Sequence, residues 1–261
     1  PLIVGIGKNE NFLASDAPAI LDYTSNVIFL DNEEIVELTP NSAKIINKTG
    51  KKVSRKISRI KWNIKQAEKA GFKHFMLKEI FEQPNSIADS MRGRLDAVNG
   101  ELTLGGIYEY SQALVNARRI IILACGTSWH SGLVAEYLFE EYCRIPVEVE
   151  YASEFRYRNP VIYEGDIVIA ISQSGETADT LAAIELAKSK GAIILGIVNV
   201  VGSSISRATH EGAYLHTGPE IGVASTKAFT TQVTILAMMA MMLAKKKGTI
   251  SDERFQRLLD E

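Results

Sequence analysis

From about residue 90 onward, short apolar segments alternate with longer segments of mixed polarity. Residues 119–124 and 167–171 are rich in isoleucine, as is typical of buried strands. The pattern predicts, in chain order, helix 106–116, strand 119–124, helix 129–143, strand 146–151, strand 167–171, helix 176–190, strand 193–199, strand 213–216 and helix 224–247. Strands that alternate with helices form parallel sheets with helices on both faces. We therefore expect an α/β fold, a flavodoxin-like α/β/α sandwich around a five-stranded parallel sheet.

Residues 1–48 show a different pattern, with short apolar segments separated by turn residues. Strands are expected at 2–6, 26–30, 35–38 and 43–47, and Ser15–Pro18 is expected to cap a short helical turn. Four short strands make a weak domain by themselves. We therefore expect this segment to be the end of a larger β-rich domain.

Residues 49–90 are predicted to be a linker with structure of its own. Basic residues gather in its first part, where we expect a solvated face; they are Lys51, Lys52, Arg55, Lys56 and Arg59. A helix is expected from His74 to Gln83, and Pro84 is expected to begin a second helical stretch, since proline favours the first helical position. The predicted division of the chain is 1–48, 49–90 and 91–261.

The polar loop after strand 167–171 is the most informative segment. Ser172, Gln173, Ser174 and Thr177 bring three hydroxyls and an amide to the start of a helix. Helix N-termini favour anions, because their first N–H groups lack partners and the helix dipole is positive there. The loop has no Lys or Arg, which suits a small phosphate ester held by neutral donors. The same residues also fit a Ser/Thr-capped helix that binds nothing.

A second loop of this kind, Cys125–Ser128, follows strand 119–124. In a parallel sheet both loops lie at the carboxyl ends of strands, the edge where open α/β sheets bind ligands. Neither loop has the Gly-x-Gly-x-x-Gly or Walker lysine pattern of a nucleotide site. The two loops therefore predict one small anionic ligand held between them.

Composition excludes several classes of function. The formal charge of −2 argues against nucleic acid as the main partner, since nucleic-acid-binding proteins usually carry a basic face. The two cysteines, Cys125 and Cys143, lie at the two ends of one predicted helix, too far apart for a disulfide. Such free thiols fit a reducing cytoplasm. Four scattered histidines give no metal-binding pattern, so no metal is expected.

The longest apolar run, Val233–Ala244, is shorter than the roughly 18 residues that a membrane span needs. A helix that is apolar all round is expected to be buried. Its four methionines fit either the core or a subunit interface, and we favour the core, since methionine packs into irregular gaps. No signal peptide is evident at Pro1, and we expect a cytoplasmic protein with no membrane partner.

Six segments carry a resemblance to known proteins. They are Glu10–Asp16, Lys78–Pro84, Cys125–Ser128, Tyr151–Arg158, Ser172–Thr180 and Glu220–Thr230. The last four look like motifs of the sugar isomerase (SIS) domain. All six in this order resemble the glutamine–fructose-6-phosphate aminotransferase (isomerizing), or glucosamine-6-phosphate synthase, family. The resemblance implies the end of an Ntn-type glutaminase domain, a linker and the first of two SIS domains.

Members of that family convert fructose 6-phosphate and glutamine to glucosamine 6-phosphate and glutamate, without cofactor or metal. The resemblance implies that the nucleophilic cysteine and the second SIS domain, with its acid/base residues, fall outside this chain. We therefore expect no catalytic residue here, and an inactive fragment that binds the sugar phosphate. A homodimer is also implied, and the apolar helix 224–247 is expected to present the associating surface.

The resemblance also implies which residues bind the substrate. Ser172, Gln173, Ser174 and Thr177 would bind phosphate oxygens. Thr127 and Ser128 would bind phosphate or a sugar hydroxyl, and the backbone of Val223 would lie near the sugar. These are the expected substrate-binding residues.

Other polar residues of the motifs are expected to have structural roles. Glu176 would favour the dipole of its helix, and Ser225 would cap helix 224–247. Lys227 is expected in a structural salt bridge, although it could instead be a substrate cation. Arg156 and Arg158 could pair with an anion, but surface or structural roles are preferred.

The rival hypothesis is a SIS-domain sensor of sugar phosphates, such as a transcriptional regulator with a helix-turn-helix domain. Residues 1–75 read as β-rich, without a compact basic three-helix domain. This leading segment therefore favours the enzyme over the sensor.

Overall fold

The computed structural model describes residues 2–15, 19–60 and 69–260, which form two compact units, Pro1–Phe75 and Met76–Glu261. We call them the N-terminal unit and the sheet unit, and each is considered by itself. The division between them lies within the predicted linker.

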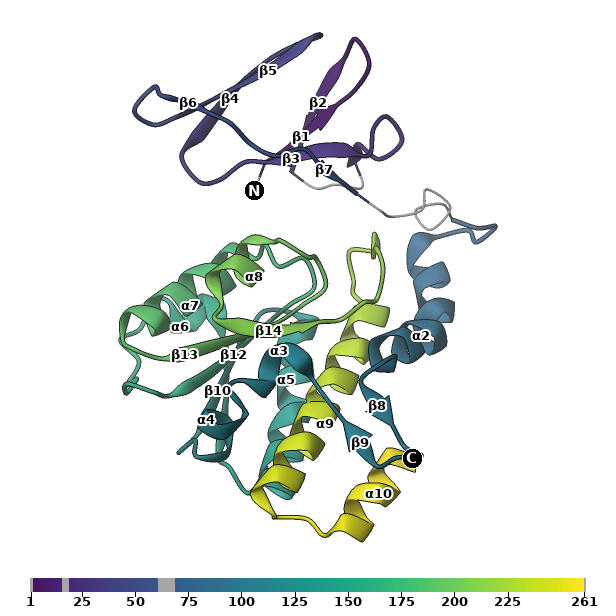
Figure 1. Cartoon of the computed structure of the whole chain (residues 1–261), viewed down its shortest axis with the longest axis vertical. Helices are drawn as coiled ribbons and strands as arrows, with labels where there is room; N and C mark the ends of the chain where they lie inside the picture. The colour runs from purple at the N-terminus through teal and green to yellow at the C-terminus, as the bar shows by residue number, and fades with distance from the viewer. Residues whose placement is uncertain (1, 16–18, 61–68, 261) are drawn as a thin grey trace. The chain divides into compact units, whose positions relative to one another are not determined.

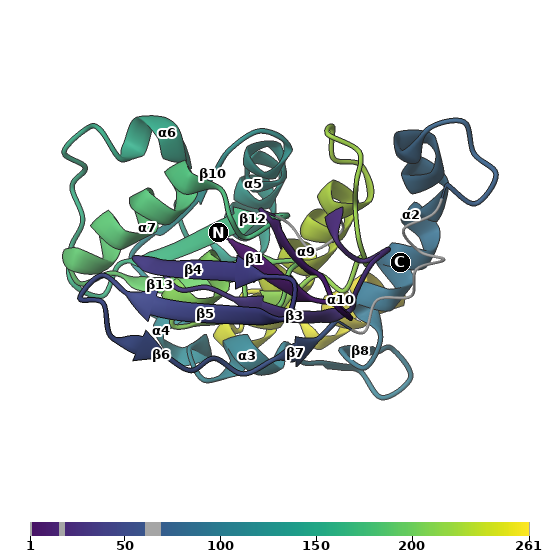
Figure 2. The ribbon, with the colours of Figure 1, turned by 90° about the horizontal axis from the view of Figure 1, so that it is seen from above.

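The N-terminal unit contains two small antiparallel sheets. The first has the order β2 (Asn11–Ala14), β1 (Ile3–Ile6), β3 (Asn26–Phe29) and β7 (Ser58–Arg59). The second has the order β4 (Glu34–Thr39), β5 (Ser42–Asn47) and β6 (Lys52–Val53), and these strands lie side by side in Figure 2. Alternate residues of β1 and β3 enter two different apolar clusters, one around Ile3 and Val27 and one around Val4 and Ile28. The four predicted strands are confirmed, whereas the short strands β2, β6 and β7 were not predicted.

Two further predictions for this unit have different outcomes. The turn expected at Ser15–Pro18 falls largely outside the described residues. Within the basic run, Arg55 donates to the Glu34 carboxylate, and this hydrogen bond lowers the pKa of Glu34. Arg55 is therefore part of a salt bridge and not simply a solvated residue.

The sheet unit is built on five parallel strands in the order β11-β10-β12-β13-β14 (Figure 1). Their bounds are β10 Ile120–Ala124, β11 Val147–Tyr151, β12 Ile167–Ser172, β13 Ile193–Val198 and β14 Glu211–Tyr214. Every residue of β10 and β12 is buried, as expected for central strands covered on both faces. The predicted five-stranded parallel sheet is confirmed.

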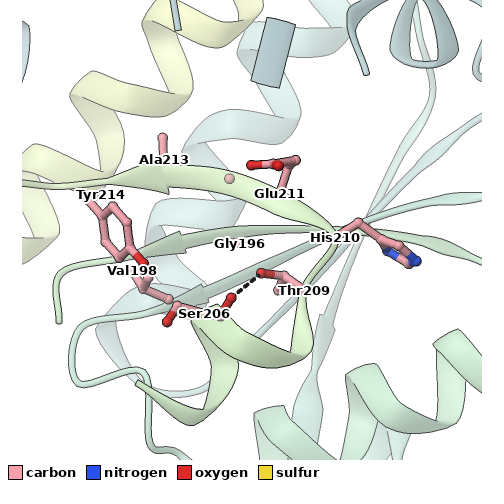
Figure 3. A pocket seen from close by; sticks show the side chains of 9 residues that line it. Gly196, Val198, Ser206, Thr209, His210, Glu211, Ala213 and Tyr214 are labelled. Atoms are coloured by element: carbon pink, nitrogen blue, oxygen red, sulfur yellow. Dashed lines mark hydrogen bonds between the residues drawn. The ribbon is translucent and has the colours of Figure 1, made fainter. Parts of the chain in front are cut away.

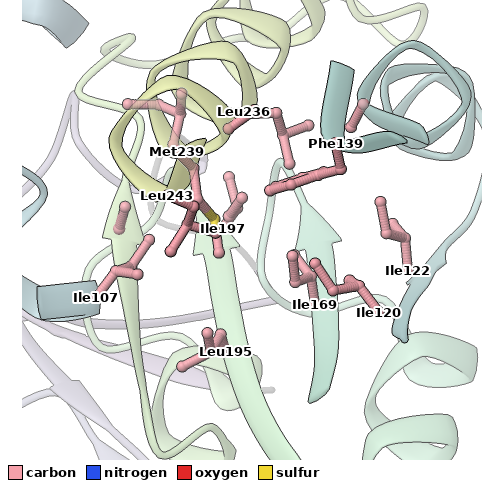
Figure 4. Close-up of a cluster of buried hydrophobic side chains, with 14 of the residues drawn as sticks. Ile107, Ile120, Ile122, Phe139, Ile169, Leu195, Ile197, Leu236, Met239 and Leu243 are labelled. Carbon is pink, nitrogen blue, oxygen red and sulfur yellow. The ribbon is translucent and has the colours of Figure 1, made fainter. Parts of the chain in front are cut away.

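Helices cover both faces of this sheet. The first face packs against α3 (Gly105–Tyr108), α4 (Ser111–Val115), α5 (Thr127–Leu138), η2 (Phe139–Cys143) and α9 (Lys227–Lys247), and the second against α6 (Ala152–Phe155), α7 (Ala178–Ser189) and α8 (Ser204–Ala208). Figure 4 shows the first core, where Ile120, Ile169 and Ile197 of the sheet meet Phe139 and Met239. The three-layer α/β/α arrangement is therefore confirmed.

The remaining elements of this unit are α2 (Phe75–Met91), whose residues from Met76 onward belong to it, the hairpin β8 (Leu95–Asp96) with β9 (Glu101–Leu102), and α10 (Asp252–Asp260). Helix α2 runs through Pro84 without the predicted restart. Proline cannot donate to the carbonyl of Ile80, and the side-chain amide of Gln83 donates to that oxygen at 3.0 Å instead. The helix therefore keeps this carbonyl satisfied across the proline.

Several predicted helix bounds were wrong. The helix expected over 106–116 is two short helices, α3 and α4, because Tyr110 lies between them at φ −93° and ψ 2°. The helix expected over 129–143 begins at Thr127, and its last turn, η2, is a π-helix. The helices expected to begin at 176 and 224 begin at Ala178 and Lys227.

Helix α9 is the one helix in the described part of the chain that is long and apolar enough to cross a membrane. Most of it is buried inside the sheet unit, against α5 and the sheet. Its four methionines, Met238, Met239, Met241 and Met242, are all buried, which confirms their predicted place in the core.

The loop between β12 and α7 turns at Gly175, which lies at φ +67°. A Cβ at this position would be 2.0 Å from the Oγ of the buried Ser203. Gly202 has a similar φ of +77° but faces open space. We predict that Gly202→Ala lowers the free energy of unfolding by about 1 kcal/mol through backbone strain alone. Gly175→Ala should lower it clearly more, because overlap with Ser203 is added; equal losses in chemical denaturation would contradict this packing.

The two thiols should differ in reactivity. Cys143 is buried, its Sγ donates to the carbonyl of Ala240 at 3.1 Å, and burial raises its pKa to about 12. The reactive thiolate is therefore scarce below that pH. In native protein at pH 8 we expect a chromogenic disulfide reagent to label one thiol per chain, and a second after denaturation. Cys125→Ala should abolish the native signal; a persisting signal would show that Cys143 is accessible.

Candidate functional site

Strands β10 and β12 are hydrogen-bonded neighbours and run in the same direction. The loops that follow them, Cys125–Ser128 and Ser172–Thr177, therefore lie at the same edge of the sheet. A weak contact joins the two βα units, from the Thr180 hydroxyl to the Cys125 sulfur at 3.9 Å. The structure thus gathers the two polar loops that the sequence singled out.

In the second loop, two serine oxygens accept hydrogen bonds from the backbone. Ser172 Oγ accepts from the N–H of Gly175 at 3.0 Å, and Ser174 Oγ accepts from the N–H of Glu176 at 3.1 Å. The hydroxyls of Ser172 and Thr177 are 3.1 Å apart, and either can be the donor. A hydroxyl has one proton and two lone pairs. With a lone pair already occupied, the serine protons are available to hydroxyl neighbours and to an anion.

The loop is also held from the next strand along. The N–H of Asn199, just after β13, donates to the carbonyl of Gln173 at 3.2 Å, and the N–H of Ile205 donates to that of Gly175 at 2.9 Å. These bonds fix the backbone of the loop while the Gln173 side chain remains partly exposed. The backbone of the loop is therefore held in place by residues after β13 and in α8.

The first loop contributes two different environments. Thr127 is the first residue of α5 and is half-buried. Ser128 is buried, and its Oγ accepts from the side-chain amide of Gln232 on α9 at 2.9 Å. Ser131 donates to the carbonyl of Ser128 at 2.7 Å. Ser128 is therefore tied to the protein interior as well as to the loop.

Glu176 has a role other than the one predicted. Helix α7 begins at Ala178, so Glu176 precedes it, and its carboxylate accepts instead from the N–H of Ser204 at 2.8 Å. Ser204 is the first residue of α8. The carboxylate of Glu176 thus accepts from an N–H group at the start of α8 that has no partner within the helix. This hydrogen bond joins the polar loop to α8.

Val223 belongs to a third segment, 220–226, and its side chain is fully exposed. The segment is held by two carboxylates. The buried Glu79 of α2 accepts from the N–H groups of Ile221 and Gly222, and Glu220 accepts from Ser225 Oγ and the N–H of Thr226. No hydrogen bond among the described residues joins Val223 to the other six predicted binding residues.

Two predictions for this segment have opposite outcomes. Ser225 does not cap α9; it donates to Glu220, whose carboxylate also accepts from the N–H of Ala228 at 3.2 Å in the first turn of the helix. Lys227 forms the predicted structural salt bridge, with its Nζ 2.7 Å from Glu82, and it is 3% exposed. Glu220, not Ser225, therefore supplies the capping acceptor.

The arginines near the site are paired within the protein. Arg156 forms a salt bridge with Asp179 at 2.8 Å, and Arg158 pairs with Glu150. The preferred structural roles are therefore confirmed for both. Any anion held between the loops would meet hydroxyl, amide and N–H donors at the ends of α5 and α7. In the part of the chain that the structure describes, no cluster of three potential metal ligands occurs.

Three important residues escaped the sequence analysis: Glu79, Glu220 and Gln232. Glu79 and Glu220 stood inside segments already recognised as motifs, Lys78–Pro84 and Glu220–Thr230, which was the available signal. Gln232 is a polar residue just before the apolar run of α9, and a polar residue in a buried helix indicates a buried partner.

A pocket of about 280 Å³ lies elsewhere, between α8 and the strands β13 and β14 (Figure 3). Its lining includes Thr209, whose hydroxyl donates to the Ser206 carbonyl at 3.1 Å, together with His210, Glu211 and Tyr214. None of the seven predicted binding residues lines it. The pocket and the hydroxyl-rich loops are therefore separate features.

Comparison with known proteins gives consistent results. Residues 113–242 match the model of the SIS domain family. The whole chain is 56% identical to part of the glutamine–fructose-6-phosphate aminotransferase (isomerizing) of Bacteroides thetaiotaomicron and 53% identical to part of that of Chlorobaculum tepidum. It spans about 43% and 42% of the length of these relatives.

Solved structures agree. The C-terminal domain of glucosamine-fructose-6-phosphate aminotransferase from Francisella tularensis superimposes with a TM-score of 0.68 at 40% identity, covering 74% of this chain and 53% of that one. Glucosamine-6-phosphate deaminase from Thermotoga maritima, at 20% identity and a TM-score of 0.54, covers 72% of this chain and 53% of that one and shows the shared fold alone.

These matches agree with the six motif segments and with the three-layer architecture of the sheet unit. Residues 113–242 therefore match the SIS domain family, and the chain resembles, over its whole length, part of the glutamine–fructose-6-phosphate aminotransferases (isomerizing).

Proposed function

We propose that the sheet unit binds the phosphate of fructose 6-phosphate or glucosamine 6-phosphate between the loops Cys125–Ser128 and Ser172–Thr177. The observation that carries this proposal is that three serine hydroxyl oxygens already accept hydrogen bonds from the protein. Those of Ser128, Ser172 and Ser174 each accept an N–H from the protein. Their protons can then be directed at phosphate oxygens, which are strong acceptors.

The binding residues in this proposal are those of the sequence analysis. Ser172, Gln173, Ser174 and Thr177 hold phosphate oxygens, while Thr127 and Ser128 bind phosphate or a sugar hydroxyl. Val223 contributes its backbone from segment 220–226, which would lie near the sugar. No cofactor or metal takes part.

We further propose that this chain is the substrate-binding part of a cytoplasmic enzyme, which makes glucosamine 6-phosphate and glutamate from fructose 6-phosphate and glutamine. The names of the relatives support this reaction. A glutaminase domain would release ammonia from glutamine, and residues 1–48 would be the C-terminal part of that domain. The chemistry would need residues that this chain does not supply, so none of its own residues is assigned a catalytic role.

A sugar-phosphate sensor is the alternative, because a neutral, preorganised anion site would also serve a regulator. The N-terminal unit argues against it. Its described residues form two antiparallel sheets and not a compact helical DNA-binding domain. The enzyme is therefore the preferred function.

Removal of two loop hydroxyls tests the binding site. The double variant Ser174→Ala, Thr177→Val should weaken glucosamine 6-phosphate binding in calorimetry by about 1–3 kcal/mol, because phosphate oxygens lose donors. Ser189→Ala is the matched control: its hydroxyl donates to Leu186 at the far end of the same helix α7. An unchanged affinity in the double variant, with the fold retained, would overturn the site assignment.

We also propose a homodimer, as the resemblance implies. The surface first expected to associate, on α9, was wrong, since most of that helix is buried within the sheet unit. The low net charge of −2 still offers little repulsion between copies. Light scattering at micromolar concentration should give about twice the chain mass of 28.7 kDa. A mass that stays at that of one chain on concentration would contradict the dimer.

A further inference from the structure

Gln232 is a buried amide that the proposed function does not explain. It lies on α9, is 0% exposed and is followed by the apolar part of the helix. A buried amide costs free energy unless its donors and acceptor are paired. Gln232 meets this requirement by reaching Ser128, a residue 104 positions earlier in the chain.

Two serines of α5 fix the amide. Ser131 Oγ lies 2.7 Å from the carbonyl of Ser128 and 3.1 Å from Gln232 Oε1, to both of which it can donate. Gln232 Nε2 then donates to Ser128 Oγ at 2.9 Å. All three side chains are buried, so water does not compete for these bonds. The carbonyl end of the amide faces Ser131 and the NH₂ end faces Ser128.

This arrangement decides how the Ser128 hydroxyl is used. Its oxygen is already an acceptor for the amide, so its single proton points away from Gln232. The other two serines of the site, Ser172 and Ser174, accept backbone N–H groups in the same way. In Ser128, however, a side-chain amide, that of Gln232, performs the task.

We propose that Gln232, held by Ser131, is a positioning residue that makes Ser128 a hydrogen-bond donor to the anionic ligand. The inference rests on the proposed sugar-phosphate site and goes beyond it, because Gln232 does not touch the ligand. With Ser128 as a donor, the site would favour a ligand that places an acceptor, such as a phosphate oxygen, opposite this hydroxyl. If the NH₂ end of the amide faced Ser131 instead, Ser128 would donate into the protein and be lost to the ligand.

Substitutions of Gln232 separate these possibilities. Gln232→Glu presents an acceptor to Ser128, which should turn the hydroxyl inward and weaken glucosamine 6-phosphate binding about tenfold or more at pH 8. Gln232→Met has similar length but neither donor nor acceptor, leaves Ser128 free to donate, and should weaken binding only a few-fold. Calorimetry on the full chain gives the affinities, and thermal unfolding confirms that each variant is folded.

A double-mutant cycle distinguishes positioning from general packing. In a Ser128→Ala background, Gln232→Glu should cause a clearly smaller loss, because no hydroxyl is left to turn and only the repulsion between the carboxylate and the phosphate remains. Equal losses in the two backgrounds, or a Gln232→Glu affinity like that of Gln232→Met, would overturn the inference. If Gln232→Glu does not fold, Ser131→Ala is the second variant: it frees the amide to rotate and should weaken binding a few-fold, again only when Ser128 is present.

The same experiment reports separately on the proposed function. Ser128→Ala alone should weaken binding if Ser128 contacts the ligand. An unchanged affinity in that variant would remove Ser128 from the site and overturn the inference with it. A loss in Ser128→Ala without the expected loss in Gln232→Glu would leave the binding site standing and overturn the role of Gln232.

Discussion

The site depends on the parallel pairing of β10 with β12. Leu123 pairs with Ala170, so the two strands end within a residue or two of each other at one edge of the sheet. Each strand is followed by a short loop and then by a helix, α5 after β10 and α7 after β12. The backbone hydrogen bonds between the two strands thus place two polar loops and two helix N-termini side by side. An antiparallel pairing would have sent the two loops to opposite edges.

The two loops lack a positive charge, and this limits how they could bind an anion. The nearby arginines are neutralised by Asp179 and Glu150, and the loops contain no cation. A site without a fixed positive charge must hold an anion through oriented dipoles, and such donors are useful only if their protons point outward. In the proposed site, the N–H groups that donate to the serine oxygens would provide this orientation. The same neutrality would allow a charged product to leave.

Local patterns were enough to predict the sheet, its three layers and the two polar loops. Isoleucine-rich runs such as 120–124 identify buried strands because few other environments accept them. Contacts over long sequence separations could not be predicted in this way. Gln232 meets Ser128, and Glu79 meets Ile221, which lies 142 residues later. The predicted starts of α7 and α9 were two or three residues too early for a related reason. Glu176 and Glu220 lie before these helices, where their carboxylates accept hydrogen bonds from the N–H groups of Ser204 and Thr226.

Two carboxylates of α2, the buried Glu79 and the partly exposed Glu82, tie this helix to the rest of the sheet unit. Glu79 satisfies the N–H groups of the segment that carries Val223, and Glu82 neutralises Lys227 at the start of α9. A domain that started at residue 91, as the pattern of alternating strands and helices suggested, would lack both carboxylates. It would leave a buried ammonium without a counter-charge and two N–H groups of the loop without acceptors, each a substantial cost in free energy. Helix α2 is therefore as much a part of the sheet unit as the sheet itself, and the segment at Val223 is held in position by it.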